Sequence, residues 1–190
     1  MEVKIDDKQY QVNCVLNSNL KTFENVSKTL NDDKLEYADK IVYVIKELSD
    51  IPIDILEIAD LEQLQELFNQ ITKFEFDKEN YKIINEVDID GVKYITPKSF
   101  EKFEDIKLNR SQHKTIKKFI ENGNNYVAAI MTCYFTEDGN QLIEENENFH
   151  KRLALFNEKM ELNVAIPYIT KVIQTVATQM GQTIESFQQQ

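Results

Sequence analysis

Hydrophobic and polar residues alternate in two short stretches of the chain, and this alternation predicts two β-hairpins. Half-buried strands show such a period of two. The second stretch contains Asp90-Gly91, a favoured two-residue turn, because both central residues of a type I′ turn need a positive φ. We therefore predict hairpins over residues 4–12 and 84–95. The alternating apolar positions are Val3, Ile5, Tyr10 and Val12 in the first stretch and Val87, Ile89 and Tyr94 in the second.

The two predicted hairpins belong to a repeated sequence pattern. The segment EVKID at residues 2–6, followed by Tyr10, recurs as EVDID at residues 86–90, followed by Tyr94. A second match follows in the same order, between FENV at residues 23–26 and FEDI at residues 103–106. Internal repeats determine the architecture of a chain.

The repeat predicts a mainly α protein with short β-hairpins (α+β), made of two related halves. Each half is a hairpin followed by helices. We predict an N-terminal half over residues 1–76, a C-terminal half over residues 82–181 and a polar tail over residues 182–190. The highly charged segment 74–81 is the expected boundary between the halves.

Apolar residues at helical spacing predict the helices of both halves. In the first half they begin near Phe23 and near Ala38, and a third helix begins after Asp60, its N-cap. In the second half Thr96-Pro97 predicts a helix start, and Pro167 is expected in the first turn of the last helix. The face expected to be buried in the third helix is Leu61, Leu64, Leu67, Phe68 and Ile71; residues 126–134 form an apolar helix.

Composition limits the classes of function. A net charge of −11 over 190 residues opposes contact with nucleic-acid backbones, so no direct nucleic-acid binding is expected. The charged N-terminus does not resemble a signal peptide, and no apolar run approaches the roughly 20 residues of a membrane span. Cys14 and Cys133 indicate a reducing compartment and are both predicted to be buried small hydrophobes.

The sequence contains no motif that predicts a catalytic site, a cofactor site or a metal site. Residues 88–91 (DIDG) have the alternating acids of a calcium loop, but Pro97 stands where that loop needs a bidentate Glu. His113 and His150 lack a partner at the spacing of a helical zinc site. The chain also lacks a glycine-rich phosphate loop. We therefore expect a protein that is not an enzyme and holds no cofactor.

One basic cluster is the candidate interaction patch of this acidic chain. Its cations surround His113 and have few acids between them. Such a run is typical of a solvated helix face, and the alternative is a site for an anionic ligand. A separate hypothesis places Tyr37, Tyr43 and Tyr81 at a protein interface, where tyrosine is enriched. The residues of the basic patch are Lys107, Arg110, Lys114, Lys117 and Lys118.

The order of elements resembles small proteins encoded in the structural modules of tailed phages that infect Bacteroidetes, crAss-like phages included. The resemblance rests on the paired hairpins at residues 2–10 and 86–94, the apolar helix from Tyr126 and the closing helix over residues 162–176. It implies a virion cargo protein or a tail-assembly chaperone, in the host cytoplasm during assembly and in the capsid or tail of the virion. The implied partners are portal, tail or capsid proteins, with self-association as a further expectation.

Two alternatives stay open. The first is an acidic binding module, either a DNA mimic or an inhibitor of a basic partner, because long-range charge steers such encounters. The second is an enzyme with a site outside the known motifs.

Overall fold

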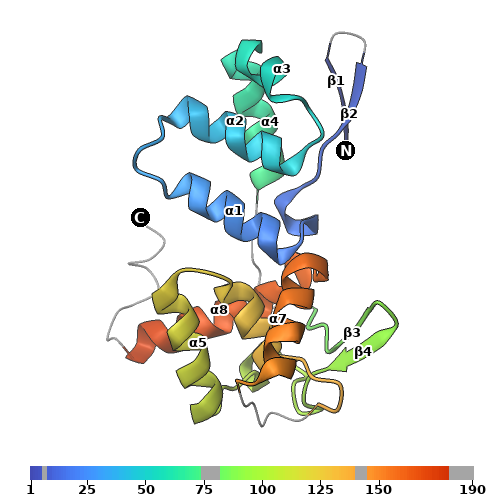
Figure 1. The fold of residues 1–190 in the computed structure, drawn as a ribbon, viewed down its shortest axis with the longest axis vertical. Coiled ribbons are helices and arrows are strands. Elements are labelled where there is room, and N and C mark those ends of the chain that lie inside the picture. Colours follow the sequence, from blue (N-terminus) through green and yellow to red (C-terminus); the bar gives the residue numbers. More distant parts are fainter. Residues whose placement is uncertain (6–7, 74–81, 140–144, 180–190) are drawn as a thin grey trace. The chain divides into compact units, whose positions relative to one another are not determined.

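The computed structural model describes residues 1–5, 8–73, 82–139 and 145–179 (Figure 1). About 60% of the described residues are helical, and they form eight α-helices and two small antiparallel sheets. The predicted fold class, mainly α with short β-hairpins, is therefore confirmed. The chain divides into two compact units, one of Met1–Glu75 with Glu161–Asn163 and one of Phe76–Met160 with Val164–Gln190.

In the first unit, helix α2 is the central element, because α1, α3 and α4 all pack against it. The face of α2 that they cover consists of Ile41, Val44, Ile45 and Leu48, which are all buried. The elements of this unit are β1 (Glu2–Ile5), β2 (Lys8–Gln11), the 3₁₀ helix η1 (Val15–Asn17), α1 (Leu20–Leu30), α2 (Tyr37–Leu48), α3 (Ile53–Ile58) and α4 (Leu61–Thr72).

In the second unit, helix α6 is the core element and lies against both α5 and α7. It confirms the apolar helix predicted from Tyr126, and every residue from Val127 to Tyr134 is buried. The elements of this unit are β3 (Glu86–Ile89), β4 (Val92–Ile95), the 3₁₀ helix η2 (Phe103–Asp105), α5 (Arg110–Asn122), α6 (Tyr126–Tyr134), α7 (Glu147–Lys159) and α8 (Leu162–Gln179).

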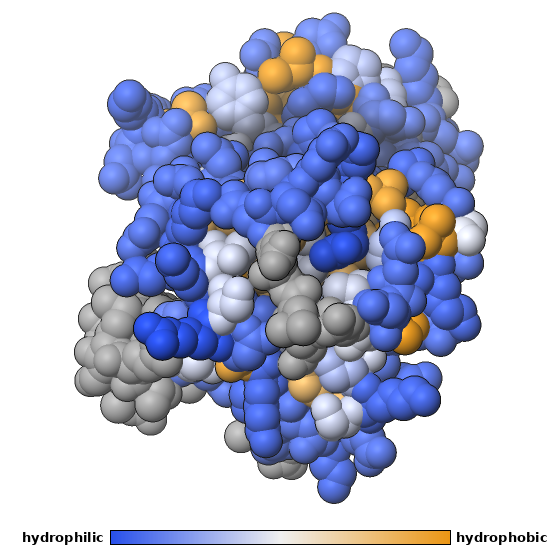
Figure 2. Space-filling view, turned by 60° about the horizontal axis from the view of Figure 1, so that its bottom comes forward, coloured by the Kyte–Doolittle hydropathy of each residue, from blue (hydrophilic) through white to orange (hydrophobic). Residues whose placement is uncertain are grey.

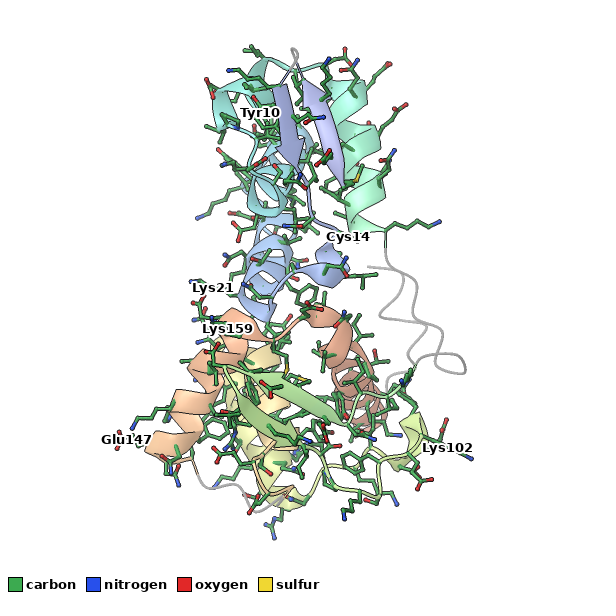
Figure 3. All side chains as sticks on the ribbon, turned by 90° about the vertical axis from the view of Figure 1, so that its right-hand side faces the viewer. Tyr10, Cys14, Lys21, Lys102, Glu147 and Lys159 are labelled. Carbon is green, nitrogen blue, oxygen red and sulfur yellow. The ribbon has the colours of Figure 1, made fainter. Side chains whose placement is uncertain are left out.

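The two hairpins have the same pairing register. Val3 pairs with Tyr10 in the first hairpin, and Val87 pairs with Tyr94 in the second. Tyr10, labelled in Figure 3, and Tyr94 are both buried. The turn of the second hairpin is the predicted type I′, with φ 54° at Asp90 and 80° at Gly91.

Each hairpin is also connected to the helix pair that follows it. Val12 forms an antiparallel bridge with Ser49, directly after α2, and Ile95 forms one with Thr136, shortly after α6. Two strands, a 3₁₀ helix and four α-helices follow one another in each unit. The second sequence match does not follow this order, because residues 23–26 lie in α1 whereas residues 103–106 fall mainly in η2.

The helix predicted to start at Thr96-Pro97 is wrong. The chain forms only the 3₁₀ turn η2 before α5, although Phe100, Phe103 and Ile106 are buried as expected. Asn85 explains the difference, because its Nδ2 donates to the Phe100 carbonyl at 2.6 Å. A helix would have used that carbonyl as an acceptor for its own backbone. The Asn85 backbone carbonyl also accepts from the Thr96 N–H at 2.9 Å, which ties Thr96 to the segment before β3.

Three single-residue expectations need correction. Leu61 is 47% exposed, because it is the first residue of α4 and precedes the turn that packs on α2. Pro167 lies in the second turn of α8, since that helix begins at Leu162. Cys14 is only partly buried, whereas Cys133 is buried as predicted.

Asp60 is confirmed as the N-cap of α4, where its Oδ1 accepts from the N–H groups of Glu62 and Gln63. The predicted boundary at 74–81, Tyr81 and the tail over residues 182–190 lie outside the described residues.

Candidate functional site

The basic patch lies on and just before α5, whose N-terminus is fixed by two reciprocal hydrogen bonds. The Asn109 side chain accepts from the Gln112 N–H at 2.9 Å, and the Gln112 side chain accepts from the Asn109 N–H at 2.8 Å. Gln112 is fully buried, and its Nε2 donates to the Cys133 carbonyl at 2.6 Å. This capping box therefore anchors the start of α5 to α6.

The five predicted cations do not form one continuous site. Lys118 Nζ lies 2.8 Å from both carboxylate oxygens of Glu145, and Lys117 Nζ lies 3.7 Å from Glu121. These two lysines line one side of α5 together with Lys114, and their charge is largely balanced by the two acids.

The other two predicted cations line a separate open hollow of about 580 Å³ on the second unit. Lys107 and Arg110 meet Lys171 from α8 there, so three permanent cations face a single carboxylate, that of Glu104. We call these four residues together with His113 the basic hollow. Two cations of the basic hollow, Lys107 and Arg110, belong to the patch predicted from the sequence. The third, Lys171, comes from a helix far away in the sequence.

Lys171 is the member of the basic hollow whose position is defined by a contact. Lys171 Nζ lies 5.0 Å from the centroid of the Phe103 ring, a cation–π distance. His113 Nε2 is buried and has no hydrogen-bond partner among the described residues. The hollow therefore presents three cations, and the position of one of them is defined by an aromatic ring.

A second candidate surface lies on the first unit. Residues 47–72 contain seven Asp and Glu side chains and no Lys, Arg or His, and all seven acids are exposed. The same segment presents Ile58 at 84%, Leu61 at 47% and Ile53 at 38% exposure. We call this region, α3 with the first turns of α4, the acidic–apolar surface. Its acids on these helices are Asp54, Glu57, Asp60, Glu62 and Glu66.

Exposed apolar side chains elsewhere are scattered. On the face shown in Figure 2, hydrophobic atoms form small separate spots in a mainly hydrophilic surface. Tyr37 and Tyr43 are 57% and 44% exposed, but six positions apart on α2 they point about 120° away from each other. They do not form one patch.

One thiol and two phenolic hydroxyls of the second unit are buried in its core. Burial raises the pKa of the Cys133 thiol to about 12, and the nearby Arg152 only partly opposes that shift. Burial also raises the pKa of the Tyr134 and Tyr168 hydroxyls. These groups are neutral and inaccessible at neutral pH, so their role is packing.

Among the residues that the structure describes, no group of three or more His, Cys, Asp and Glu side chains is arranged to hold a metal ion. Within that same part of the chain, no helix combines the length and apolar character needed to cross a bilayer.

Two functional candidates were not found from the sequence. Lys171 carries no signal by itself, because only the fold brings α8 to the start of α5. Ile58 does have one, since it lies within a 26-residue segment, 47–72, that contains acids but no base.

Comparison with known proteins gives no match: no family model, no curated protein and no solved structure is similar to this chain. The chemistry of the two surfaces is therefore the basis for function.

Proposed function

We propose that this chain is a non-enzymatic binding protein that acts through protein–protein contacts made by its acidic–apolar surface. The observation that carries the proposal is the exposure of Ile58 and Leu61 within a segment of seven acids and no base. Exposed apolar groups ringed by charge are typical of interaction sites.

The energetics favour a partner of defined chemistry. Burying a large aliphatic side chain that was exposed contributes about 1.5 to 3 kcal/mol, so Ile58 and Leu61 are suitable anchors. The surrounding acids would face Lys or Arg side chains and steer the encounter. We infer a partner segment that combines apolar anchors with basic residues.

The environment of three buried side chains in the second unit supports a role other than catalysis. Cys133, Tyr134 and Tyr168 are all buried, and burial holds each in its neutral form. Catalytic groups are usually tuned toward reactivity and placed in a cleft, and these three are tuned in the opposite direction.

The resemblance to phage structural-module proteins suggests where this binding takes place. In that setting the partners are portal, tail or capsid proteins, met in the host cytoplasm during assembly, and the chain remains in the virion as cargo or leaves as a chaperone. Such assemblies use contacts between proteins and need no cofactor.

A second candidate function is an acidic inhibitor of a basic partner, and the distribution of charge favours it. Residues 1–75 contain 16 acidic and 8 basic side chains, a net charge of −8 out of −11 for the whole chain. Salt separates the two functions, because a purely charge-driven complex weakens steeply with ionic strength whereas an apolar contact changes little.

We also propose that the two units are versions of one folding unit. The equal hairpin registers and the bridges at Val12 and Ile95 support this relationship. The helix packing differs, since α1, α3 and α4 all pack on α2, whereas the main partners of α6 are the helices directly before and after it, α5 and α7. A duplicated unit would let one copy diverge into the acidic surface.

The proposal is tested by affinity purification from infected cells with the tagged chain, followed by mass spectrometry. We expect phage structural proteins with the wild type, and at least a tenfold loss with Ile58→Ser and Leu61→Ser combined. Ile120→Ser is the matched control, because Ile120 is 42% exposed on α5. Recovery of the same proteins with the double variant would contradict the proposal.

A further inference from the structure

We propose that the basic hollow of the second unit is a binding site for a small phosphate-bearing anion. This site is distinct from the acidic–apolar surface and goes beyond the proposed protein contacts. The argument starts from its charge: Lys107, Arg110 and Lys171 face only Glu104 in a protein whose net charge is −11. A local excess of cations in an acidic chain attracts anions that the rest of the surface repels.

The donors come from three elements and point to one ligand. Lys107 precedes α5, Arg110 begins it, and Lys171 belongs to α8. Arg110 offers the planar fork that binds phosphate through two hydrogen bonds, and the two lysines add point charges. His113 also lines the hollow, so its ring lies beside the expected ligand.

The site is largely formed without its ligand. The reciprocal bonds between Asn109 and Gln112 fix the start of α5, and the Phe103 ring lies 5.0 Å from Lys171 Nζ. Arg110, Lys117 and Lys118 lie on one helix, yet Lys117 and Lys118 each have an acidic partner, whereas no partner is found for Arg110 among the described residues. A cation without an acidic partner binds an anion without first giving up the favourable energy of an existing ion pair.

The size of the hollow limits the ligand class. At about 580 Å³ it falls in the range of small-molecule sites, about 300 to 1,000 Å³, and has room for more than one phosphate group. The shared chemistry is a diphosphate, which either an inorganic polyphosphate or a nucleotide supplies.

The two histidines allow a direct test by NMR of the imidazole resonances of the full chain. His113 lines the hollow. His150 belongs to α7, where its Nε2 lies 3.5 Å from a Glu145 carboxylate oxygen, and it acts as an internal control. Titration with inorganic pyrophosphate at constant ionic strength should shift the His113 signals saturably and leave those of His150 in place. Equal, non-saturating shifts of both histidines, or a shift of His150 alone, would overturn the site.

Variants then assign the contacts. Arg110→Gln and Lys171→Gln should each weaken pyrophosphate binding about tenfold or more. Lys117→Gln removes the same charge from the same helix but outside the hollow, and should bind within about twofold of the wild type. An equal loss in all three variants would reduce the effect to net charge and contradict the proposal.

A second arm identifies the source of the phosphate. Adenosine diphosphate binding more tightly than pyrophosphate would support a nucleotide ligand, and equal binding would support an inorganic one. A single-stranded oligonucleotide that shifts His113 at lower concentration than either would contradict the small-ligand assignment.

Discussion

The Tyr134 and Tyr168 rings pack with their centroids 4.9 Å apart, yet their hydroxyls differ in hydrogen bonding to the described residues. The Tyr168 hydroxyl donates to two acceptors, the Ile84 carbonyl at 3.1 Å and Asn85 Oδ1 at 3.2 Å. The Tyr134 hydroxyl is buried with no partner among the described residues. The pair thus combines one anchored and one unsatisfied polar group in a shared aromatic core.

This asymmetry predicts opposite effects of two identical substitutions. Tyr168→Phe should lower the free energy of unfolding by about 1 to 2 kcal/mol, because it removes the hydroxyl that donates to the Ile84 carbonyl and to Asn85 Oδ1. Tyr134→Phe should be neutral or stabilise by up to about 1 kcal/mol, since it removes an unsatisfied hydroxyl. Urea denaturation of both variants provides the measurement, and equal destabilisation would refute the assigned contacts.

The buried amide of Gln112 should be a major support of the second unit. Gln112→Ala removes its bond to the Cys133 carbonyl and half of the cap of α5, so we expect a loss of about 2 to 3 kcal/mol. Gln63→Ala on α4 is the matched control, because Gln63 is exposed, and should cost less than about 0.5 kcal/mol. Thermal or urea unfolding distinguishes the two variants.

Stability should fall at alkaline pH. The Cys133 thiol has a folded pKa of about 12 against an ordinary value of 9.0, so between these values the unfolded chain releases a proton that the folded chain keeps. Its contribution to stability is complete below pH 9 and declines by about 1.4 kcal/mol for each pH unit up to 12. The raised pKa values of Tyr134 and Tyr168 act in the same direction.

Tyrosinate absorbance and circular dichroism, followed together from pH 8 to 12, measure this effect. Cys133→Ala should reduce the slope of stability against pH. A protein whose stability is constant across this range would contradict the buried environment of these groups.

The two cysteines should differ in reactivity. Cys14 is partly exposed next to η1, whereas Cys133 is buried in α6 with a raised pKa. A thiol reagent at pH 7.5 should therefore modify one cysteine in the folded protein and both in denaturant. Peptide mapping identifies the modified residue, and native labelling of Cys133 would be the contrary result.

The hairpins and most helices were predictable because the residues that determine each of them lie close together in the sequence. The Asp90-Gly91 turn and the Asp60 N-cap are decided by neighbouring residues, and both are confirmed. The failed helix at Thr96-Pro97 is decided instead by Asn85, which bonds to Thr96 and to the Phe100 carbonyl, more than ten residues away. The spacing of apolar residues in the segment after Thr96 gives no sign of these hydrogen bonds from Asn85.

The candidate surfaces were predictable only in part for the same reason. The basic run before and along α5 was visible in the sequence, but which cations are neutralised depends on Glu145 and on the arrival of Lys171. Leu61 fits the apolar period of α4 and is nevertheless exposed. The helical spacing of apolar residues predicts which residues share a face. It does not predict that the first residue of a helix, here Leu61, lies outside the contact with the neighbouring helix.

The most direct test of the acidic–apolar surface is site-specific photo-crosslinking in infected cells, with a photoreactive residue in place of Ile58 or, as a control, Ile120. The account predicts that position 58 crosslinks to a phage structural protein through a segment rich in Lys or Arg, and that position 120 does not. Crosslinks to that protein at position 120 alone, or equally at both positions, would contradict it.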